Sequence, residues 1–411
     1  MAKYNDFDDE YEYEYDNQEQ NGYYYDEQYY YEEEPDPYER VRKPANNRKG
    51  RKKKKGRKKF IAIFAVEFIV LLGLLGVWYF ANKISKIHHD PIDRNQVIVN
   101  QFSQKTENVL KGYRNILLLG SDARESSIDA LNKTGENHTD AILVASINLD
   151  TYEVRLVSIY RDTLMRIPKS DIVKNEQYNK ATEAMFFYGA ESTMSMLNTN
   201  LDLDIKDYIL VNWEAVIQMV DAVGGIDIDI DEEERYWINE YMRDTALNTG
   251  RGSNYEQVQN AGHVHLNGLQ ATAYCRIRAT SGWDYRRTER QRTVISKVVE
   301  KAKKFNLSQI NKVLDAVCEN MVTSMDNSEL VSMAKEAAKY SLTQTGGFPY
   351  DRIDNVDHIS GLALRDPVIA KDLVNNVAKL HQFLFDVNDF EASDTVKEID
   401  REINNFDMVY R

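Results

Sequence analysis

Six arginines lie within 17 residues of a domain that is otherwise acidic. The guanidinium group is a planar fork of N–H donors, which suits bidentate binding of phosphate or carboxylate. We expect a helix that begins near Thr288, with Arg287, Arg290 and Gln291 on one face and free backbone N–H groups at its start. A solvated, salt-bridged helix face is the ordinary alternative. The clustering favours an anion site, with the candidates Arg276, Arg278, Arg286, Arg287, Arg290 and Arg292.

Acidic side chains stand at the ends of three short apolar runs. Asp122 follows NILLLG, Asp140 precedes AILVASI, and Arg161 and Asp162 follow the run that ends at Ile159. Ligands collect at strand ends in α/β sheets, and two carboxylates there could bind Mg²⁺, which prefers oxygen ligands. The spacing leaves two alternatives open: Asp122 could cap the next helix, and Asp162 could pair with an arginine.

The strands and helices around these side chains must position them. Runs of Leu, Ile and Val between turn residues predict buried strands at Asn115–Gly120, Ala141–Asn148 and Glu153–Ile159, the last two joined in a hairpin. Helical patterns occupy Asn179–Thr199, Trp213–Val223, Gly268–Ala279, Thr288–Phe305, 306–345 and Asp366–Leu384. Strands mixed with helices imply a layered α/β domain.

The N-terminal region has a composition unlike that of a folded domain. Residues 1–59 predict a disordered cytoplasmic tail, acidic and tyrosine-rich at first and polybasic from residue 41. The tyrosines could serve phosphorylation or scaffolding, or the tail could simply be solvated. Residues 60–81 are almost continuously apolar, long enough for a transmembrane helix, and too far along the chain for a cleaved signal peptide. The basic flank predicts a single-pass signal-anchor with the N-terminus inside and the bulk of the chain outside the cell membrane.

Three further segments follow the predicted span: a polar stalk at 82–108, a folded domain at 109–386 and an acidic C-terminal tail at 387–411. The part of the chain beyond the span is acidic overall, which argues against a nucleic-acid partner. Two cysteines, Cys275 and Cys318, cannot form a disulfide framework, and their pairing is left open.

The order and spacing of six motifs resemble the LytR-CpsA-Psr family. The motifs are NILLLGSDAR, HTDAILVASI, VRLVSIYRDTLMRIP, VNWEAVIQMVDAVGGIDIDI, LNGLQATAYCRIR and DYRRTERQRTVI, and a membrane anchor precedes them as in that family. The resemblance covers residues 109–305 closely and extends more weakly to 386. It implies a three-layer α/β/α sandwich with a mixed central sheet and an apolar groove for a lipid.

The resemblance also implies an activity at a Gram-positive cell surface. Members of this family transfer wall teichoic acid, capsular polysaccharide or related anionic glycopolymers from a polyprenyl-pyrophosphate carrier to peptidoglycan, forming a phosphodiester. By match to the motifs, Asp122 and Asp140 are expected to bind Mg²⁺ (or Mn²⁺). The residues expected to hold the pyrophosphate and complete the site are Arg124, Arg161, Arg276, Arg278, Asp284, Arg287, Arg290 and Gln291.

One residue departs from the family pattern. The family usually has arginine two residues before the second metal-binding aspartate, and His138 stands there in this chain. A neutral imidazole offers one donor and no fixed charge. We therefore expect His138 to bind the pyrophosphate more weakly, or with more dependence on pH, than an arginine would.

Phosphoryl transfer assigns roles to some of these residues. Arg161 and Arg287 would stabilise the charge on the leaving phosphate, and either Asp162 or Asp284 would accept the proton of the attacking hydroxyl. Two other functions stay open at this point. The same site could hydrolyse its substrate with water, or the chain could be a non-catalytic, membrane-anchored binder or regulator of cell-wall enzymes.

Overall fold

The computed structural model describes residues 79, 82–83, 85–121, 134–135, 138–305 and 307–411. These all belong to the second of two compact units, Ala65–Arg411. The predicted tail at 1–59, the predicted span apart from Tyr79, and the candidates Asp122 and Arg124 lie outside the described residues. None of the helices in the described ranges is long and apolar enough to cross a bilayer.

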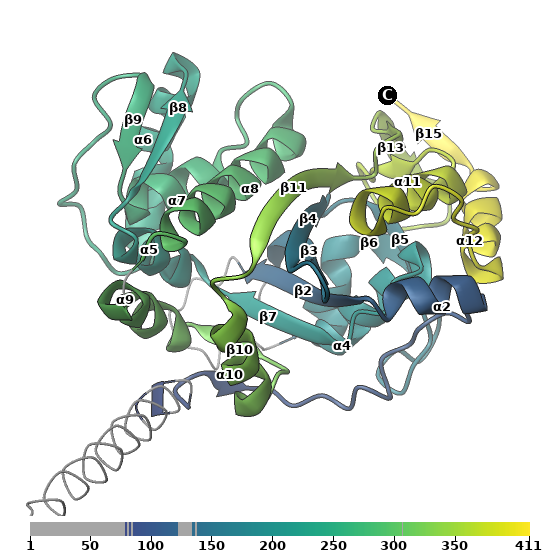
Figure 1. Cartoon of the computed structure of the whole chain (residues 1–411). Helices are drawn as coiled ribbons and strands as arrows, with labels where there is room; N and C mark the ends of the chain where they lie inside the picture. Colours follow the sequence, from purple (N-terminus) through teal and green to yellow (C-terminus); the bar gives the residue numbers. More distant parts are fainter. Residues whose placement is uncertain (1–78, 80–81, 84, 122–133, 136–137, 306) are drawn as a thin grey trace, which may run out of the picture. The chain divides into compact units, whose positions relative to one another are not determined.

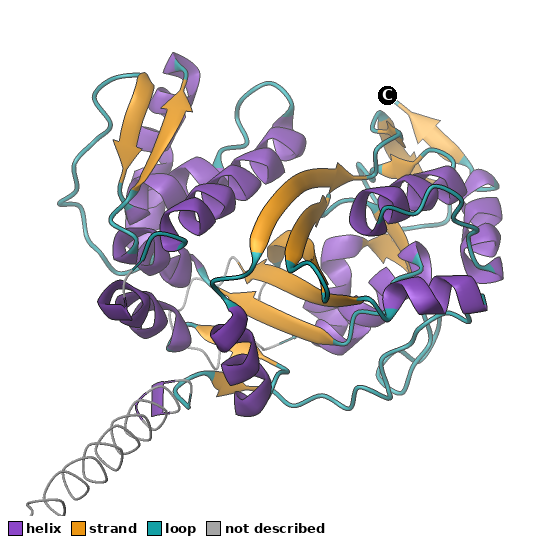
Figure 2. Cartoon of the chain, viewed as in Figure 1, coloured by secondary structure: helices purple, strands orange, loops and turns teal. Residues whose placement is uncertain are grey.

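A seven-stranded sheet forms the centre of the described part of the chain (Figures 1 and 2). Its order is β1-β10-β7-β2-β3-β4-β11. The pairs β2–β3, β3–β4 and β7–β10 are antiparallel, while β1–β10, β2–β7 and β4–β11 are parallel. The predicted mixed sheet is therefore confirmed. The strands are β1 His88–His89, β2 Tyr113–Ser121, β3 Thr139–Asn148, β4 Glu153–Ile159, β7 Asp207–Val211, β10 Met321–Thr323 and β11 Ser341–Phe348.

Helices cover both faces of this sheet, because successive side chains of a strand point to opposite sides. On one face, Leu117, Val144 and Val157 share a core with α4 (Ala181–Leu201), α11 (Leu373–Phe385) and α12 (Asp394–Asn404). On the other face, Leu143 and Leu156 pack against Ile295 of α8 (Trp283–Ala302). Next to them, Ile116 and Ile147 pack against Met333 of α10 (Asn327–Glu336).

A second core lies beside the sheet, toward the left of Figure 1. It is formed by α5 (Trp213–Ala222), α6 (Glu232–Asn248), α7 (Gly268–Arg276) and the antiparallel hairpin of β8 (Ile226–Ile230) and β9 (Gly262–Leu266). Helix α8 contacts both this second core and the central sheet. Val294 is buried in the second core, and Ile295 packs against the sheet. Capping boxes begin α6 at Asp231 and α7 at Asn267, which fixes where both helices start.

Short strand pairs and helices complete the described structure. They are the pairs β5 (Leu164–Ile167) with β6 (Gln177–Lys180), β12 (Arg352–Ile353) with β14 (Ile369–Ala370) and β13 (Val356–Ile359) with β15 (Met408–Tyr410), and the helices α2 (Gln104–Leu110) and α9 (Leu307–Cys318).

The local predictions hold best where a strand is apolar. β2, β3 and β4 occupy the predicted runs to within two residues, and the Asn148 side chain accepts hydrogen bonds from the backbone of Asp150 and Thr151 in the predicted hairpin. Three helical predictions are wrong in part. In the range Asp366–Leu384, residues Ile369–Ala370 form β14, and the helix α11 begins only at Leu373. Residues 306–345 contain β10 and most of β11 as well as α9 and α10, and α8 begins at Trp283 rather than near Thr288. Arg287, Arg290 and Gln291 therefore lie inside α8, and their own backbone does not form its N-terminal anion site.

The segments that were predicted as a stalk and a C-terminal tail pack onto the domain. In the first segment, Arg94 forms ion pairs with Asp207 and Glu329, at 2.5 and 2.6 Å. In the second, α12 buries Val396, Ile399 and Ile403 in the main core. The folded body therefore extends past both predicted boundaries, 109 and 386.

Candidate active site

The strand order brings Asp140 and Arg161 together at one edge of the sheet. β3 runs antiparallel to β4, and Ile142 pairs with Ile159, so the beginning of β3 lies beside the end of β4. Arg161 Nη1 donates to Asp140 Oδ1 at 2.6 Å. β2 ends at the same edge, where Ser121 pairs with Thr139. Asp122 follows Ser121 in the sequence.

Two more arginines reach Asp140 from the helical side. Arg278, just after α7, donates from Nη2 to Asp140 Oδ1 at 2.7 Å. Arg287 of α8 donates from Nη2 to the Asp140 carbonyl at 3.2 Å, and its Nη1 lies 3.4 Å from Oδ1. Burial alone would raise the pKa of Asp140, but Arg287, Arg278 and Arg161 together hold this pKa below its usual value. Asp140 is therefore a carboxylate in this site.

Asp284, in the first turn of α8, lies among the same three arginines at longer range. Its oxygens are 3.3 Å from Arg287 Nη2, 3.4 Å from Arg161 Nε and 3.6 Å from Arg278 Nε. Each of these arginines thus lies between Asp140 and Asp284. The resemblance to the family implied that Arg161, Arg276, Arg278 and Arg287 bind one ligand. The structure brings Arg161, Arg278 and Arg287 together.

A lysine that the sequence analysis missed joins the site through Asp162. Lys180 Nζ lies 2.9 Å from Asp162 Oδ1, and Arg161 Nε lies 3.5 Å from Asp162 Oδ2. Backbone hydrogen bonds hold the start of α4 against this segment, from Thr182 to Arg161 O and from Ala181 to Thr163 O. Burial raises the pKa of Asp162, but Arg161 and Lys180 more than offset this and lower it. Lys180 directly follows Asn179, where the sequence predicted the start of a helix, but a single lysine carries no spacing signal.

We call these side chains the arginine–aspartate cluster: Asp140, Asp162, Asp284, Arg161, Arg278, Arg287 and Lys180. Several buried polar atoms in and beside the cluster have no hydrogen-bond partner among the described residues. They are Nε of Arg161, Nε and Nη1 of Arg287, and both polar side-chain atoms of Gln291. The Arg287 side chain is only 1% exposed. Because buried donors are normally paired, these atoms mark a place where an anionic or polar ligand would complete the hydrogen bonding.

Three predicted residues make other contacts. Arg276 donates to Thr245 Oγ1 at 2.7 Å and to Asp244, and lies over the Trp213 ring. The structure therefore places Arg276 against α5 and α6 and does not bring it into the cluster. The His138 ring stacks on Phe186 with centroids 4.2 Å apart.

Arg290 is buried and uses all three guanidinium nitrogens inside the protein. It binds Glu234 Oε1 at 2.9 Å, the Ile277 carbonyl at 3.2 Å and Thr280 Oγ1 at 2.8 Å. These contacts brace the segment that carries Arg278. The pyrophosphate contact predicted for Arg290 stays a prediction, as does that of Arg276. The open question of the cysteines is answered, since Cys275 and Cys318 are both buried and unpaired.

One described residue at this edge, Asp140, is of a type that binds hard divalent cations, and its Oδ1 already accepts hydrogen bonds from Arg161 and Arg278. Asp140 offers carboxylate oxygens, and Mg²⁺ is commonly held by one or two carboxylates together with substrate phosphates. The described ranges contain no group of three or more His, Cys, Asp or Glu side chains arranged to hold a metal ion. The second predicted ligand, Asp122, lies outside those ranges.

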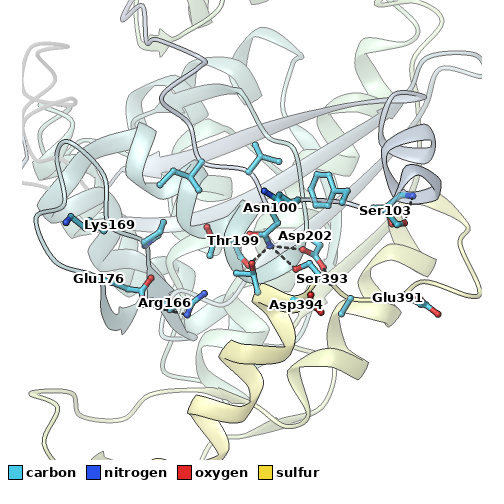
Figure 3. A pocket seen from close by; sticks show the side chains of 18 residues that line it. Asn100, Ser103, Arg166, Lys169, Glu176, Thr199, Asp202, Glu391, Ser393 and Asp394 are labelled. Carbon is cyan, nitrogen blue, oxygen red and sulfur yellow. Dashed lines mark hydrogen bonds and ion pairs between the residues drawn. The ribbon is translucent and has the colours of Figure 1, made fainter.

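A separate cavity of about 760 Å³ lies where residues 98–106, β5 and the start of α12 meet (Figure 3). Asn100 stands at its centre and donates to Asp202 Oδ1 at 2.7 Å and to the Thr199 carbonyl at 2.9 Å. Asp202 also accepts from the Ser393 backbone at 2.7 Å. These bonds join three distant segments of the chain, and none of the residues that line the cavity belongs to the arginine–aspartate cluster.

Known proteins resemble this chain in sequence over most of its length. The profile of the LytR_cpsA_psr family matches residues 74–356. The polyisoprenyl-teichoic acid–peptidoglycan teichoic acid transferase TagU of Bacillus cereus (strain AH820) is 30% identical over 288 residues, 68% of this chain and 83% of its own. The TagU transferase of Enterococcus faecalis (strain ATCC 700802 / V583) is 27% identical over 317 residues, 73% of this chain and 93% of its own.

The fold has solved counterparts. The crystal structure of protein gbs0355 from Streptococcus agalactiae aligns with a TM-score of 0.52 at 23% identity, over 71% of this chain and 94% of its own. This likeness supports the α/β fold with a mixed central sheet. The family profile covers well over half of the sequence, including every described residue of the arginine–aspartate cluster. This chain therefore belongs to the LytR-CpsA-Psr family.

Proposed function

We propose that the chain transfers an anionic glycopolymer, such as wall teichoic acid or a capsular or secondary wall polysaccharide, from a polyprenyl-pyrophosphate carrier to peptidoglycan. Membership of the family and the names of the TagU relatives support this activity. The observation that carries it is the convergence of Arg161, Arg278 and Arg287 at one sheet edge, with buried donors that have no hydrogen-bond partner among the described residues. A pyrophosphate supplies the charge and the acceptor oxygens that these donors need.

The reaction exchanges a phosphoanhydride bond for a phosphate ester bond. A hydroxyl oxygen of the acceptor glycan forms a bond to the phosphorus that carries the sugar, and the bond from that phosphorus to the bridging oxygen breaks. Polyprenyl phosphate leaves with the bonding electrons. Negative charge grows on the leaving phosphate, and the three arginines stabilise it there. The protein contributes positioning and electrostatic stabilisation.

The proton of the attacking hydroxyl needs an acceptor, and the contacts favour Asp284 over Asp162. Asp162 lies 2.9 Å from the Lys180 ammonium, and its lowered pKa makes it a weak base. Asp284 shares a hydrogen bond with Asp162 and lies 3.3 to 3.6 Å from its arginines, so cations bind its oxygens less closely than those of Asp162. We assign Asp284 as the general base and Asp162 as a group that holds Arg161 in place.

Asp140, together with Asp122, would bind Mg²⁺ or Mn²⁺, which when bound would neutralise phosphate charge at the sheet edge. The predicted span at 60–81 would anchor the chain in the cell membrane, with the N-terminus in the cytoplasm and the cluster outside. In that position the enzyme would meet both a carrier lipid in the bilayer and the peptidoglycan beyond it.

The test uses the full-length protein in detergent with Mg²⁺, a short-chain polyprenyl-pyrophosphoryl disaccharide and peptidoglycan oligomers. Mass spectrometry should detect a sugar-phosphate adduct on the glycan with the unchanged protein and with Asp229→Ala, an exposed control. The Asp140→Ala variant should give none. Released sugar phosphate without an adduct would instead indicate hydrolysis, and neither product would indicate a binding protein.

A second measurement separates the enzyme from a regulator that works through its cytoplasmic tail. Deleting residues 1–38 removes the tyrosine-rich segment and leaves the polybasic run. An enzyme should keep its rate of transfer in detergent after this deletion. A rate that fell to background would show that the tail is needed for activity.

A further inference from the structure

The cavity around Asn100 is enclosed by segments that lie far apart in the chain (Figure 3). Residues 98–106, the end of β5, the end of α4 and residues 391–395 at the start of α12 all line it. Its volume of about 760 Å³ lies in the range, roughly 300–1,000 Å³, that is usual for sites that bind small molecules. Because the segments share one space, a single ligand there can contact side chains from each of them.

Arg166 is a charged side chain buried in the wall of this cavity. It is only 6% exposed, and its Nη1 lies 3.6 Å from carboxylate oxygens of Glu176, Glu398 and Glu402. No acceptor among the described residues lies within hydrogen-bond distance of this guanidinium, and of its three nitrogens only Nε is fully enclosed. The two Nη atoms therefore have access to the cavity that the side chain lines. Since a buried guanidinium normally donates hydrogen bonds, a ligand oxygen in the cavity would complete its bonding.

Asn100 and the first turn of α12 add an acceptor and further donors. The Asn100 Nδ2 group is committed to Asp202 and to the Thr199 carbonyl, which fixes the orientation of the amide. Its Oδ1 accepts no hydrogen bond from the described residues and is not enclosed. The backbone N–H groups of Asp394 and Thr395 precede the first intrahelical hydrogen bond of α12. The cavity thus presents donors and acceptors at fixed positions.

The charge of the lining excludes an anionic polymer as the ligand. Four carboxylates line the cavity against two basic side chains: Glu176, Asp202, Glu391 and Asp394 against Arg166 and Lys169. Like charges repel, so a ligand without charge, or one with an amino group, fits better than a phosphate polymer. Sugar hydroxyls both donate and accept hydrogen bonds. Phe102, half-buried in the wall, offers an apolar surface to the C–H face of a sugar ring.

We propose that this cavity is a second saccharide-binding site, which holds an uncharged or amino-bearing stretch of a glycan strand apart from the arginine–aspartate cluster. The source of the strand rests on the proposed function, in which the acceptor is peptidoglycan. Residues 163–165 alone separate Asp162 of the cluster from Arg166, so the two Cα atoms are at most about 14 Å apart. A strand bound in the cavity can therefore present a neighbouring sugar unit to the cluster.

The experiment measures binding to the full-length protein in detergent by equilibrium dialysis. The labelled probe is a tetramer of N-acetylglucosamine, and the unlabelled competitors are a glucosamine tetramer, a glycerol phosphate tetramer and a peptidoglycan stem peptide. The labelled tetramer should bind, and the glucosamine tetramer should displace it. The glycerol phosphate tetramer and the peptide should not displace it.

Variants assign the bound tetramer to the cavity. Thr395→Trp places a larger side chain in the cavity, and Arg166→Gln removes the charged donor. Each should weaken binding of the tetramer about tenfold or more, the loss expected for hydrogen bonds to a charged group. Thr343→Trp, at an exposed threonine of β11, is the matched control and should keep the affinity. Asp140→Ala should keep it as well, because Asp140 does not line the cavity. Thermal melting of each variant reports whether it is folded.

Several outcomes would overturn the saccharide site. Unchanged affinity in the folded Thr395→Trp variant would remove the tetramer from the cavity, and a loss in Asp140→Ala would place it in the cluster instead. Displacement by the stem peptide would assign the cavity to a peptide, and displacement by glycerol phosphate would assign it to an anion. Failure of the proposed function would look different. In that case the tetramer would bind in the cavity while no adduct formed on peptidoglycan.

Discussion

At the scale of single residues, the arginines of the cluster are paired with carboxylates that a phosphate group can replace. Arg161, Arg278 and Arg287 each lie between Asp140 and Asp284, and Lys180 adds a cation beside Asp162. Buried charges are costly unless they are paired, so the carboxylates keep the arginines in place before substrate arrives. A phosphate oxygen that enters the cluster can replace a carboxylate oxygen as the hydrogen-bond acceptor.

Replacing Arg161 by alanine removes the donor closest to Asp140. We expect the rate of glycopolymer transfer to fall by about a hundredfold or more, as for loss of one preorganised donor to developing charge. The melting temperature should change little, because Arg278 and Arg287 still pair with Asp140. Adduct formation by mass spectrometry and a thermal melt test this, with Arg401→Ala as control. Full transfer by Arg161→Ala would remove the role assigned to this residue.

Replacing Lys180 by methionine tests its action on Asp162. The ion pair lowers the pKa of Asp162, so its loss should raise that pKa. Below that pKa Asp162 is protonated and holds Arg161 less well, so the acidic limb of the pH–rate profile should move to higher pH. Lys180→Arg should restore the profile, and Lys169→Met, at an exposed lysine, should not change it. A profile of Lys180→Met that superimposes on that of the unchanged protein would show that the pair has no part in catalysis.

At the scale of elements, α8 is the helix on which the site depends. It carries Asp284, Arg287 and Gln291 on a body that packs on the sheet through Ile295 and on the second core through Val294. Arg290 fastens the same helix to α6 and to the segment before Arg278. Small movements of α8 would therefore separate Arg278 and Arg287 from Asp140.

Replacing Arg290 by methionine should destabilise the fold strongly, because Glu234 would be left as an unpaired buried charge. Both side chains of the pair are less than a tenth exposed. Removing one partner of such a pair typically costs about 3 to 5 kcal/mol. Denaturant titration gives the free energy of unfolding of Arg290→Met and of the double variant with Glu234→Gln, which should recover part of the loss. A single variant as stable as the unchanged protein would show that Arg290 does not brace the helix.

The elements also explain what the sequence could and could not predict. Strands β2, β3 and β4 are apolar, so their own residues identify them. Once these strands are identified, the positions of Asp140 and Arg161 at strand ends can be predicted as well. Strand β11 has the sequence SLTQTGGF, with few apolar residues, and exists because it pairs with β4, which is distant in the chain. The position of Lys180 depends on such distant pairings, and no local spacing predicts it. The predicted start of α8, near Thr288, is too late. The first turns of this helix contain Arg286 and Arg287, which do not extend the apolar face that marks a helix in the sequence.

At the scale of the whole molecule, the two ends of the described chain stabilise the central fold. Arg94 pairs with Asp207 and Glu329 near the start, and α12 completes the main core near the end. Between them, His381 of α11 is buried, lies 3.0 Å from the Leu201 carbonyl through Nε2 and stacks on Phe390 at 3.7 Å. A neutral imidazole suits this place.

The stability of the domain should therefore decrease in mild acid. Burial lowers the pKa of His381 to about 4 from 6.5, so between these values the unfolded chain binds a proton that the folded chain does not. This contribution is fully present above pH 6.5 and is lost as the pH falls toward 4, with a total of about 3 kcal/mol. The free energy of unfolding, measured from pH 4 to 8, should depend less on pH in His381→Gln. His263→Gln, at an exposed histidine, should keep the full dependence.

The pairing of β11 with β4 also determines when the enzyme first exists during its synthesis. A nascent chain that has reached only residue 340 already carries every aspartate and arginine of the cluster, but β4 is then an open edge. Open strand edges readily pair with other chains, and incompletely folded chains expose apolar surface. Products of interrupted translation would thus be poor catalysts and good targets for quality-control proteases. Activity would be confined to chains that extend past residue 348, where β11 ends.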